Sequence, residues 1–119
     1  MTYILVGAGG ALGAMLRYFL SGLLPAAWGT AAINVAGSFA MGLLVGTLAR
    51  VLPAGQEDIR LFAAVGILGG FTTFSAFSLD AVTLWQRGEL VTAGLYVLVS
   101  VGLSILGLVV GLMIARIGA

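Results

Sequence analysis

The chain has 119 residues, of which 61% are hydrophobic and only 8% charged, and its net charge is +1. A water-soluble domain carries about a quarter charged residues, so this composition excludes that class and indicates a membrane protein. Cysteine, histidine and lysine are absent, which excludes disulfides and thiolate metal sites and removes the commonest general base and Schiff-base nucleophile of enzymes. The five arginines form no cluster, so no nucleic-acid partner is expected.

Four apolar stretches are each long enough to cross a bilayer as a helix, which takes about 20 residues. They are predicted at residues 3–24, 28–52, 60–85 and 90–114. Turns are predicted at Pro25 and Pro53 and at residues 86–89. No connection is long enough to fold separately. The predicted fold is an all-α membrane protein with four transmembrane helices in one domain, residues 1–119.

The first predicted span has no basic residues before it and runs on through Arg17, so we interpret it as a retained helix and not a signal peptide. A charge at membrane depth is a functional candidate by default. Arg17 lies near the end of the span, however, where a long side chain can reach the interface. Its alternative role is to raise the local potential for an anion at a vestibule.

The second predicted span carries an amide, Asn34, six residues after its start. A buried amide is costly in hydrocarbon unless it is hydrogen-bonded. Two interpretations stay open here: Asn34 joins two helices, or its NH₂ group faces a solute.

The third predicted span contains the sequence GGFTTFSAFS at residues 69–78. Two adjacent glycines weaken a helix by about 1 kcal/mol each relative to alanine, so we expect this helix to be broken near Gly69-Gly70. Unwound backbone at membrane depth is tolerated only where it is buried in protein or lines a polar cavity. The segment therefore indicates a pathway for an ion or solute.

Phe74 and Phe77 share a face of this span and alternate with hydroxyl side chains. Core packing is the ordinary interpretation of a phenylalanine. The alternative is that the electropositive ring edges favour a small anion without the fixed charge of an arginine. Asp80 lies near the end of the same span.

The fourth predicted span places Tyr96, Ser100 and Ser104 at i, i+4 and i+8, so their hydroxyls lie on one helical face. A serine alone often bonds to its own i−4 carbonyl. A stripe that includes a tyrosine favours a polar track.

The arginines are divided almost evenly between the two membrane sides of a four-span chain, three against two. Since arginine and lysine in short loops set the orientation, this small bias favours insertion both ways and an antiparallel pair; a single orientation is the alternative. Glycine pairs spaced by four residues allow close helix contact, either in an oligomer or within one subunit. They are Gly9 and Gly13, Gly42 and Gly46, Gly66 and Gly70, and Gly107 and Gly111.

Taken together, these segments resemble the Fluc family of fluoride channels, also called the CrcB family, over essentially the whole chain. The resemblance rests on GGALGAMLRY at residues 9–18, on residues 29–39 around Asn34, and on GILGGFTTFSAFS at residues 66–78. The third block is the most specific. Ala76 and Asp80 depart from the family pattern, which often has threonine and glutamate there.

The resemblance implies a dual-topology homodimer of two antiparallel subunits, a multi-pass protein of the cell (inner) membrane with two fluoride pores. It implies passive export of F⁻ that lowers fluoride toxicity in the cytoplasm. The positions that match pore-lining residues are Asn34, Phe74, Phe77, Tyr96, Ser100 and Ser104. Gly69 and Thr72 match positions whose carbonyls hold a structural Na⁺ at the dimer centre. The implied partners are fluoride, a second copy of the chain and membrane lipid.

The main alternative function is a small multidrug-type cation/proton antiporter, also built from four spans. That chemistry needs a titratable carboxylate at mid-membrane, whereas Asp80 lies near a span end. A subunit of a larger complex is a second alternative, which leaves the polar track unexplained. An enzyme is not expected.

Overall fold

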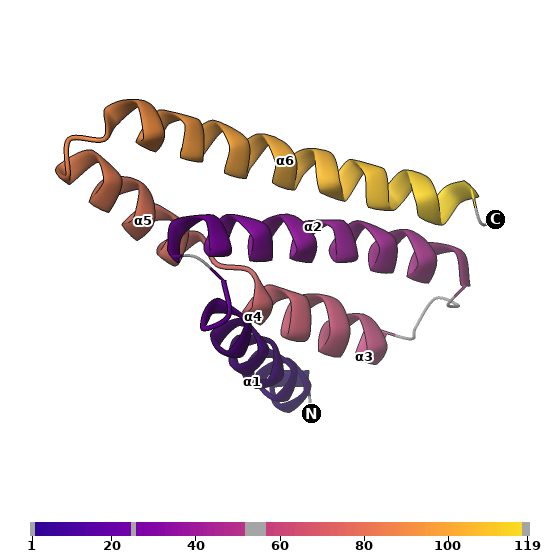
Figure 1. Ribbon diagram of the computed structural model, residues 1–119. Helices are drawn as coiled ribbons and strands as arrows, with labels where there is room; N and C mark the ends of the chain where they lie inside the picture. Colours follow the sequence, from indigo (N-terminus) through magenta and orange to yellow (C-terminus); the bar gives the residue numbers. More distant parts are fainter. Residues whose placement is uncertain (1, 25, 52–56, 118–119) are drawn as a thin grey trace.

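Helices make up the structure, a computed structural model that describes residues 2–24, 26–51 and 57–117 (Figure 1). The elements in chain order are α1 (Thr2–Ser21), α2 (Ala26–Val51), α3 (Glu57–Arg60), the π-helix η1 (Leu61–Leu68), α4 (Gly69–Phe71), α5 (Phe74–Gln86) and α6 (Leu90–Ile117). Within these ranges there is no strand. The predicted turns at Pro25 and Pro53 lie outside the described residues.

Among the described residues, four helical stretches are long and apolar enough to cross a membrane, as far as length and composition decide. They are Thr2–Ser21, Ala27–Arg50, Glu57–Gln86 and Leu90–Ile117. The prediction of an all-α chain with four membrane-spanning helices is therefore confirmed. Its boundaries agree with the predicted ones to within three residues.

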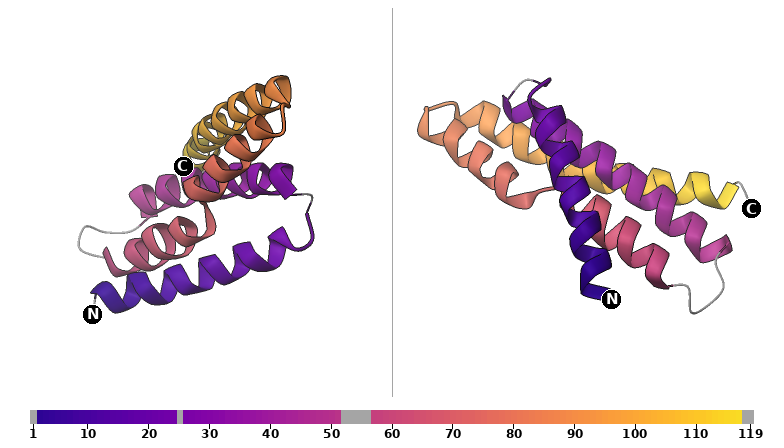
Figure 2. Two further views of the ribbon diagram at one scale, coloured as in Figure 1. Left: turned by 90° about the vertical axis from the view of Figure 1, so that its left-hand side faces the viewer. Right: turned by 90° about the horizontal axis from the view of Figure 1, so that it is seen from below.

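The helices form two pairs, and the members of each pair run in the same direction (Figures 1 and 2). α2 packs along α6, and α1 packs along η1 and α4. In the first pair Gly42 lies against the backbone of Leu108, and Gly111 lies against the carbonyl of Phe39, so neither position has room for a Cβ. Packing within one subunit therefore accounts for these glycines, the second of the two interpretations of their spacing.

The third span changes conformation after α4. Gly69 is helical, with φ −63° and ψ −38°, whereas Thr72 (φ −85°, ψ 154°) and Thr73 (φ −149°, ψ 122°) are extended. We call Thr72 and Thr73 the junction between α4 and α5. The break was predicted near Gly69-Gly70; both glycines belong to α4, and the chain leaves helical geometry two residues further on, at Thr72.

The reason for the difference lies in what Gly70 packs against. A Cβ there would lie 3.0 Å from the Cα of Gly10 in α1, so glycine serves close helix contact at this position and not backbone freedom. The helix resumes where a side chain can cap it, since the Oγ1 of Thr73 accepts a hydrogen bond of 3.2 Å from the amide of Ala76.

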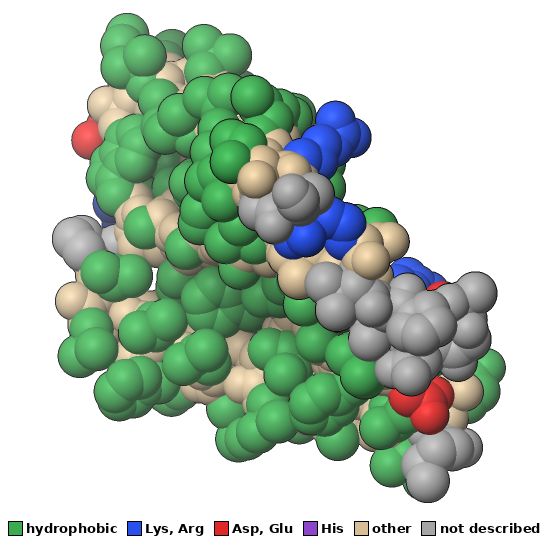
Figure 3. Space-filling view, turned by 90° about the vertical axis from the view of Figure 1, so that its right-hand side faces the viewer, with side chains coloured by type: hydrophobic (Ala, Val, Ile, Leu, Met, Phe, Trp, Pro, Cys, Tyr) green, Lys and Arg blue, Asp and Glu red, His purple; other side chains and the backbone are tan. Residues whose placement is uncertain are grey.

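Apolar side chains cover most of the surface that Figure 3 shows, while basic side chains gather where α2 and α6 end. The last turns of these helices hold Arg50 and Arg116. Few side chains are buried: the largest that is fully enclosed is Tyr96, whereas Tyr3 is 92% exposed. An apolar surface of this extent suits lipid or a partner subunit.

Candidate ion pathway at the α4–α5 junction

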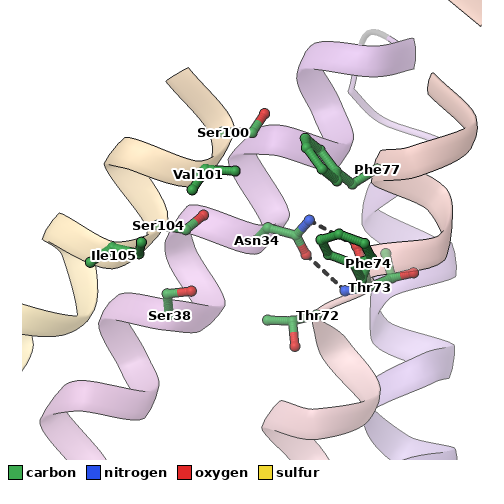
Figure 4. A pocket seen from close by; sticks show the side chains of 10 residues that line it. All are labelled: Asn34, Ser38, Thr72, Thr73, Phe74, Phe77, Ser100, Val101, Ser104 and Ile105. Atoms are coloured by element: carbon green, nitrogen blue, oxygen red, sulfur yellow. Dashed lines mark hydrogen bonds between the residues drawn. The ribbon is translucent and has the colours of Figure 1, made fainter. Parts of the chain in front are cut away.

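A cavity of about 290 Å³ lies beside the junction, between α2, α5 and α6 (Figure 4). Its polar lining consists of Asn34 and Ser38 from α2, Thr72 and Thr73 from the junction, and Ser100 and Ser104 from α6. Phe74 and Phe77 of α5 complete it together with two aliphatic side chains of α6. We call this the donor cavity. Five of the predicted pathway residues meet in it: Asn34, Phe74, Phe77, Ser100 and Ser104.

Asn34 joins α2 to the junction through both ends of its amide. Its Nδ2 donates to the carbonyl of Thr73 at 3.0 Å, and its Oδ1 accepts from the amide of Thr73 at 2.8 Å. An extended residue between two helices leaves its own N–H and C=O without helical partners, which is costly at membrane depth. Asn34 supplies both partners. Of the two interpretations of Asn34, the helix-joining one is therefore observed, while the second N–H of its NH₂ group is left over.

The hydroxyls of the junction mostly serve the helix ends beside them. Thr72 Oγ1 donates at 3.1 Å to the carbonyl of Leu68, the last residue of η1. Thr73 Oγ1 caps α5 and lies 3.1 Å from the Oγ of Ser75. These bonds fix the side chains that line one wall of the donor cavity.

Ser100 has a different environment. It is 3% exposed, and its Oγ makes no hydrogen bond to any described residue. Buried hydroxyls normally have a partner, so an orphaned one that faces a cavity calls for an explanation such as a bound ion or water. Ser104, one turn further along α6, lines the same cavity.

Tyr96 lies beyond the lining of the donor cavity. Its hydroxyl donates to Oδ2 of Asp80 at 3.1 Å, so the two residues join α6 to α5. The predicted stripe on α6 is therefore divided: two serines face the cavity, and the tyrosine hydroxyl is directed at a carboxylate. This pair was not predicted, since neither residue type nor spacing connects positions 80 and 96.

The aromatic rings form a continuous contact from the cavity to Tyr96. Phe74 and Phe77 have ring centroids 5.3 Å apart at an interplanar angle of 52°, and Phe77 stacks on Tyr96 at 5.5 Å and 28°. Phe77 is 8% exposed, so it also packs as a core residue, whereas Phe74 is 76% exposed. Core packing within the subunit thus explains Phe77 and leaves Phe74 without such a role.

Ser38 and Thr73 line the cavity and were not predicted. Ser38 follows Asn34 by four residues on α2, the same spacing that indicated the serines of α6, so this signal was present in the sequence. Arg17 lies outside the lining; its Nε donates to the carbonyl of Gly70 at 3.2 Å.

The carbonyl of Gly69 is a candidate ligand for a cation. In a continuous helix it would accept from the amide of Thr73, but that amide is directed at Asn34. The carbonyl of Thr72 follows the end of α4, on extended backbone. Carbonyl oxygens accept hydrogen bonds or bind cations and cannot bind anions, so these two atoms suit a hard cation such as Na⁺.

Comparisons with known proteins agree with the sequence pattern. The family described as "CrcB-like protein, Camphor Resistance (CrcB)" matches residues 4–112. A relative from Chelativorans sp. (strain BNC1), named fluoride-specific ion channel FluC, is 56% identical, and the match covers 95% of this chain and 94% of the relative. Relatives with the same name from Rhodopseudomonas palustris (strain BisB5) and Hyphomonas neptunium are 50% and 49% identical over at least 94% of each chain. The predicted resemblance is thereby confirmed, and the chain belongs to the CrcB family.

Proposed function

We propose that the chain is the subunit of a fluoride-selective channel, a multi-pass protein of the cell membrane that lets F⁻ leave the cell passively. The relatives named above support fluoride as the permeant ion. The observation in this structure that carries the proposal is the buried, unpartnered hydroxyl of Ser100 in a cavity lined by hydroxyls, an amide and two aromatic rings.

The lining of the donor cavity suits a small anion. Fluoride is strongly hydrated, so each lost water has to be replaced by a hydrogen-bond donor at close range. The hydroxyls of Ser38, Ser100 and Ser104 and the second N–H of Asn34 are such donors. The ring edges of the phenylalanines add weak positive potential. None of the described lining residues is charged, so nothing there holds an anion too strongly to let it leave.

The driving force needs no coupling. An interior-negative membrane potential expels an anion by about 2.3 kcal/mol per 100 mV, so a selective passive pathway is sufficient to keep cytoplasmic fluoride low. The antiporter alternative is not supported. The relatives reported above are named fluoride channels and not antiporters. In addition, the carboxylate of Asp80 accepts a hydrogen bond from Tyr96 and lies outside the lining of the donor cavity.

We further propose that two subunits associate in antiparallel orientation and that the partner completes each pathway. Phe74 supports this: it lines the donor cavity and yet is 76% exposed in one subunit. An anion beside Phe74 would face lipid unless another chain covered it. The near balance of arginines between the two ends of the four spans agrees with insertion in both orientations.

A structural Na⁺ at the dimer centre is the third part of the proposal. The carbonyls of Gly69 and Thr72 would hold it, since the first has lost its helical donor to Asn34 and the second lies on extended backbone. A bound cation would be coordinated by these oxygens and their symmetry mates, and it would keep the two junctions together.

Fluoride efflux from liposomes tests the proposed function. Protein reconstituted into vesicles loaded with potassium fluoride is expected to release F⁻ to an external electrode when valinomycin carries K⁺, with no proton gradient imposed. Chloride-loaded vesicles serve as the control and are expected to release little. Efflux that occurs only with an imposed proton gradient would support the antiporter instead.

A further inference from the structure

Arg17 of α1 lies at the C-terminal end of α4, directly before the junction. The contact is a hydrogen bond of 3.2 Å from Nε to the carbonyl of Gly70, 53 residues away in the chain. The donor cavity is lined by other residues. Arg17 therefore contacts the backbone of α4 and not the donor cavity.

The carbonyl of Gly70 needs an external partner because of where the helix ends. The last four carbonyls of a helix lack amide partners in the next turn. Here the carbonyl of Leu68 accepts hydrogen bonds from the amide and the hydroxyl of Thr72. The amide that would donate to the carbonyl of Gly69 is directed at Asn34. The carbonyl of Gly70 accepts from Arg17. A cation at this end of a helix is also favoured by the helix dipole.

The packing of α1 explains how Arg17 reaches this atom. Gly13 leaves no room for a Cβ against the carbonyl of Ile67, so the two backbones are in direct contact one turn before Arg17. The two helices run in the same direction. Side chains lean toward the N-terminus of their helix, while helical carbonyls point toward the C-terminus. A side chain just beyond the contact therefore meets the last carbonyls of α4.

We propose that Arg17 is a positioning residue, whose Nε–H holds the Gly70 carbonyl and fixes the junction from α1 while Asn34 fixes it from α2. This inference rests on the proposed fluoride pathway. It assigns Arg17 a directed hydrogen bond to backbone in place of the long-range attraction of an anion. Thr73 and Phe74 then hold their places in the donor cavity because both helices beside the junction are tied to it.

Three substitutions separate the hydrogen bond from the charge. Nε2 of glutamine lies the same number of bonds from Cα as Nε of arginine, so Arg17→Gln keeps a donor at this position and removes the charge. Arg17→Met removes both the donor and the charge, and Arg17→Lys keeps the charge but moves the nitrogen one bond further out. Fluoride efflux from liposomes is measured for all three and for the wild type.

We expect Arg17→Met to lose about tenfold or more of the efflux rate, as for a lost hydrogen bond to a charged donor, and Arg17→Gln to exceed Arg17→Met by about fivefold or more. Arg17→Lys is expected to fall below Arg17→Gln. If Arg17 acts by charge, the order reverses: lysine retains efflux, and glutamine resembles methionine, most strongly at low ionic strength, where screening is weak. That order, or equal rates for all variants, would overturn the proposal.

Hydrogen exchange supplies a readout that does not depend on transport. Amides of residues 70–77 are expected to exchange faster in Arg17→Met than in Arg17→Gln, because only the first loses the hold on α4. Equal exchange in both would overturn the proposal. If Arg17→Met does not fold, the glutamine–lysine pair decides: efflux higher in Arg17→Gln supports the proposal, and equal or lower efflux refutes it. A wild type that passes no fluoride refutes the proposed function and leaves the exchange test valid.

Discussion

α2 and α6 are held together by backbone contact at glycines along their length, whereas the junction between α4 and α5 is held by side chains from two other helices. In the first region Gly42 and Gly111 lie against backbone atoms of the facing helix. In the second, Asn34 and Arg17 make directed hydrogen bonds to carbonyls and an amide of the third span. We call the glycine-packed pair of α2 and α6 the frame. Packing thus holds the frame together, whereas hydrogen bonds set the geometry of the junction beside it.

This difference predicts how the two regions respond to substitution. Changes in the frame are expected to lower stability and to affect transport only through the amount of folded protein. Changes at the junction are expected to affect transport in protein that still folds. The substitutions that follow test this division, from the largest expected effect to the smallest.

Among the four substitutions that test this division, Asn34→Leu is expected to have the largest effect. It leaves the N–H and C=O of Thr73 without partners at membrane depth, at a cost of about 1–3 kcal/mol for each group. Fluoride efflux is expected to fall by about tenfold or more in folded protein. Asn34→Asp is the graded control, because it keeps an acceptor for the amide of Thr73 but repels its carbonyl. Efflux in Asn34→Leu equal to the wild type would show that the junction does not depend on this amide.

Gly42→Val tests the frame. The added side chain would meet the backbone of Leu108, which cannot move without parting the helices, so a loss of roughly 2–3 kcal/mol of stability is expected. Thermal unfolding in detergent measures it. Gly102→Ala, on the facing helix α6 with open space around the added Cβ, is the control and is expected to leave the unfolding temperature within a few degrees. An equal loss in both variants would contradict the division.

Thr73→Val removes the hydroxyl that caps α5 and keeps the shape of the side chain. A lost N-cap costs about 1 kcal/mol, so we expect a modest fall in both stability and efflux. Thr73→Ser retains the hydroxyl and is expected to restore both. A serine variant as impaired as the valine variant would show that the methyl group, and not the cap, matters.

Ser100→Ala has the smallest expected effect on stability. Removal of a buried hydroxyl that has no hydrogen-bond partner is nearly neutral or slightly stabilising. Efflux is nevertheless expected to fall about fivefold, as for the loss of one hydrogen bond to the ion. Loss of stability without loss of efflux would mean that Ser100 has a structural partner and no part in the pathway.

Much of the frame could be predicted from the sequence, because the bilayer demands long apolar helices and the spacing of hydroxyls on them fixes a face. The same rules identified Ser100 and Ser104. Asn34 was a candidate because an amide is rare in hydrocarbon, although its actual partner, the backbone of Thr73, could not be read from residue types.

The features that could not be predicted from the sequence depend on contacts between helices. The glycines indicated a break near Gly69-Gly70 but not its exact residues, because contact between Gly70 and α1 keeps both glycines helical and the capping hydroxyl of Thr73 sets where α5 begins. The pairing of Tyr96 with Asp80 likewise depends on how α5 lies on α6. Sequence periodicity describes one helix at a time and contains no such information.

The most direct test of the central claim, that fluoride passes through the donor cavity, is efflux in Phe74→Ile. Phe74 is 76% exposed in the subunit, so its replacement removes little packing there, and any effect reports on the pathway. With association of subunits verified by cross-linking, we expect fluoride efflux to be abolished while the protein stays folded. Efflux at the wild-type rate would contradict the account.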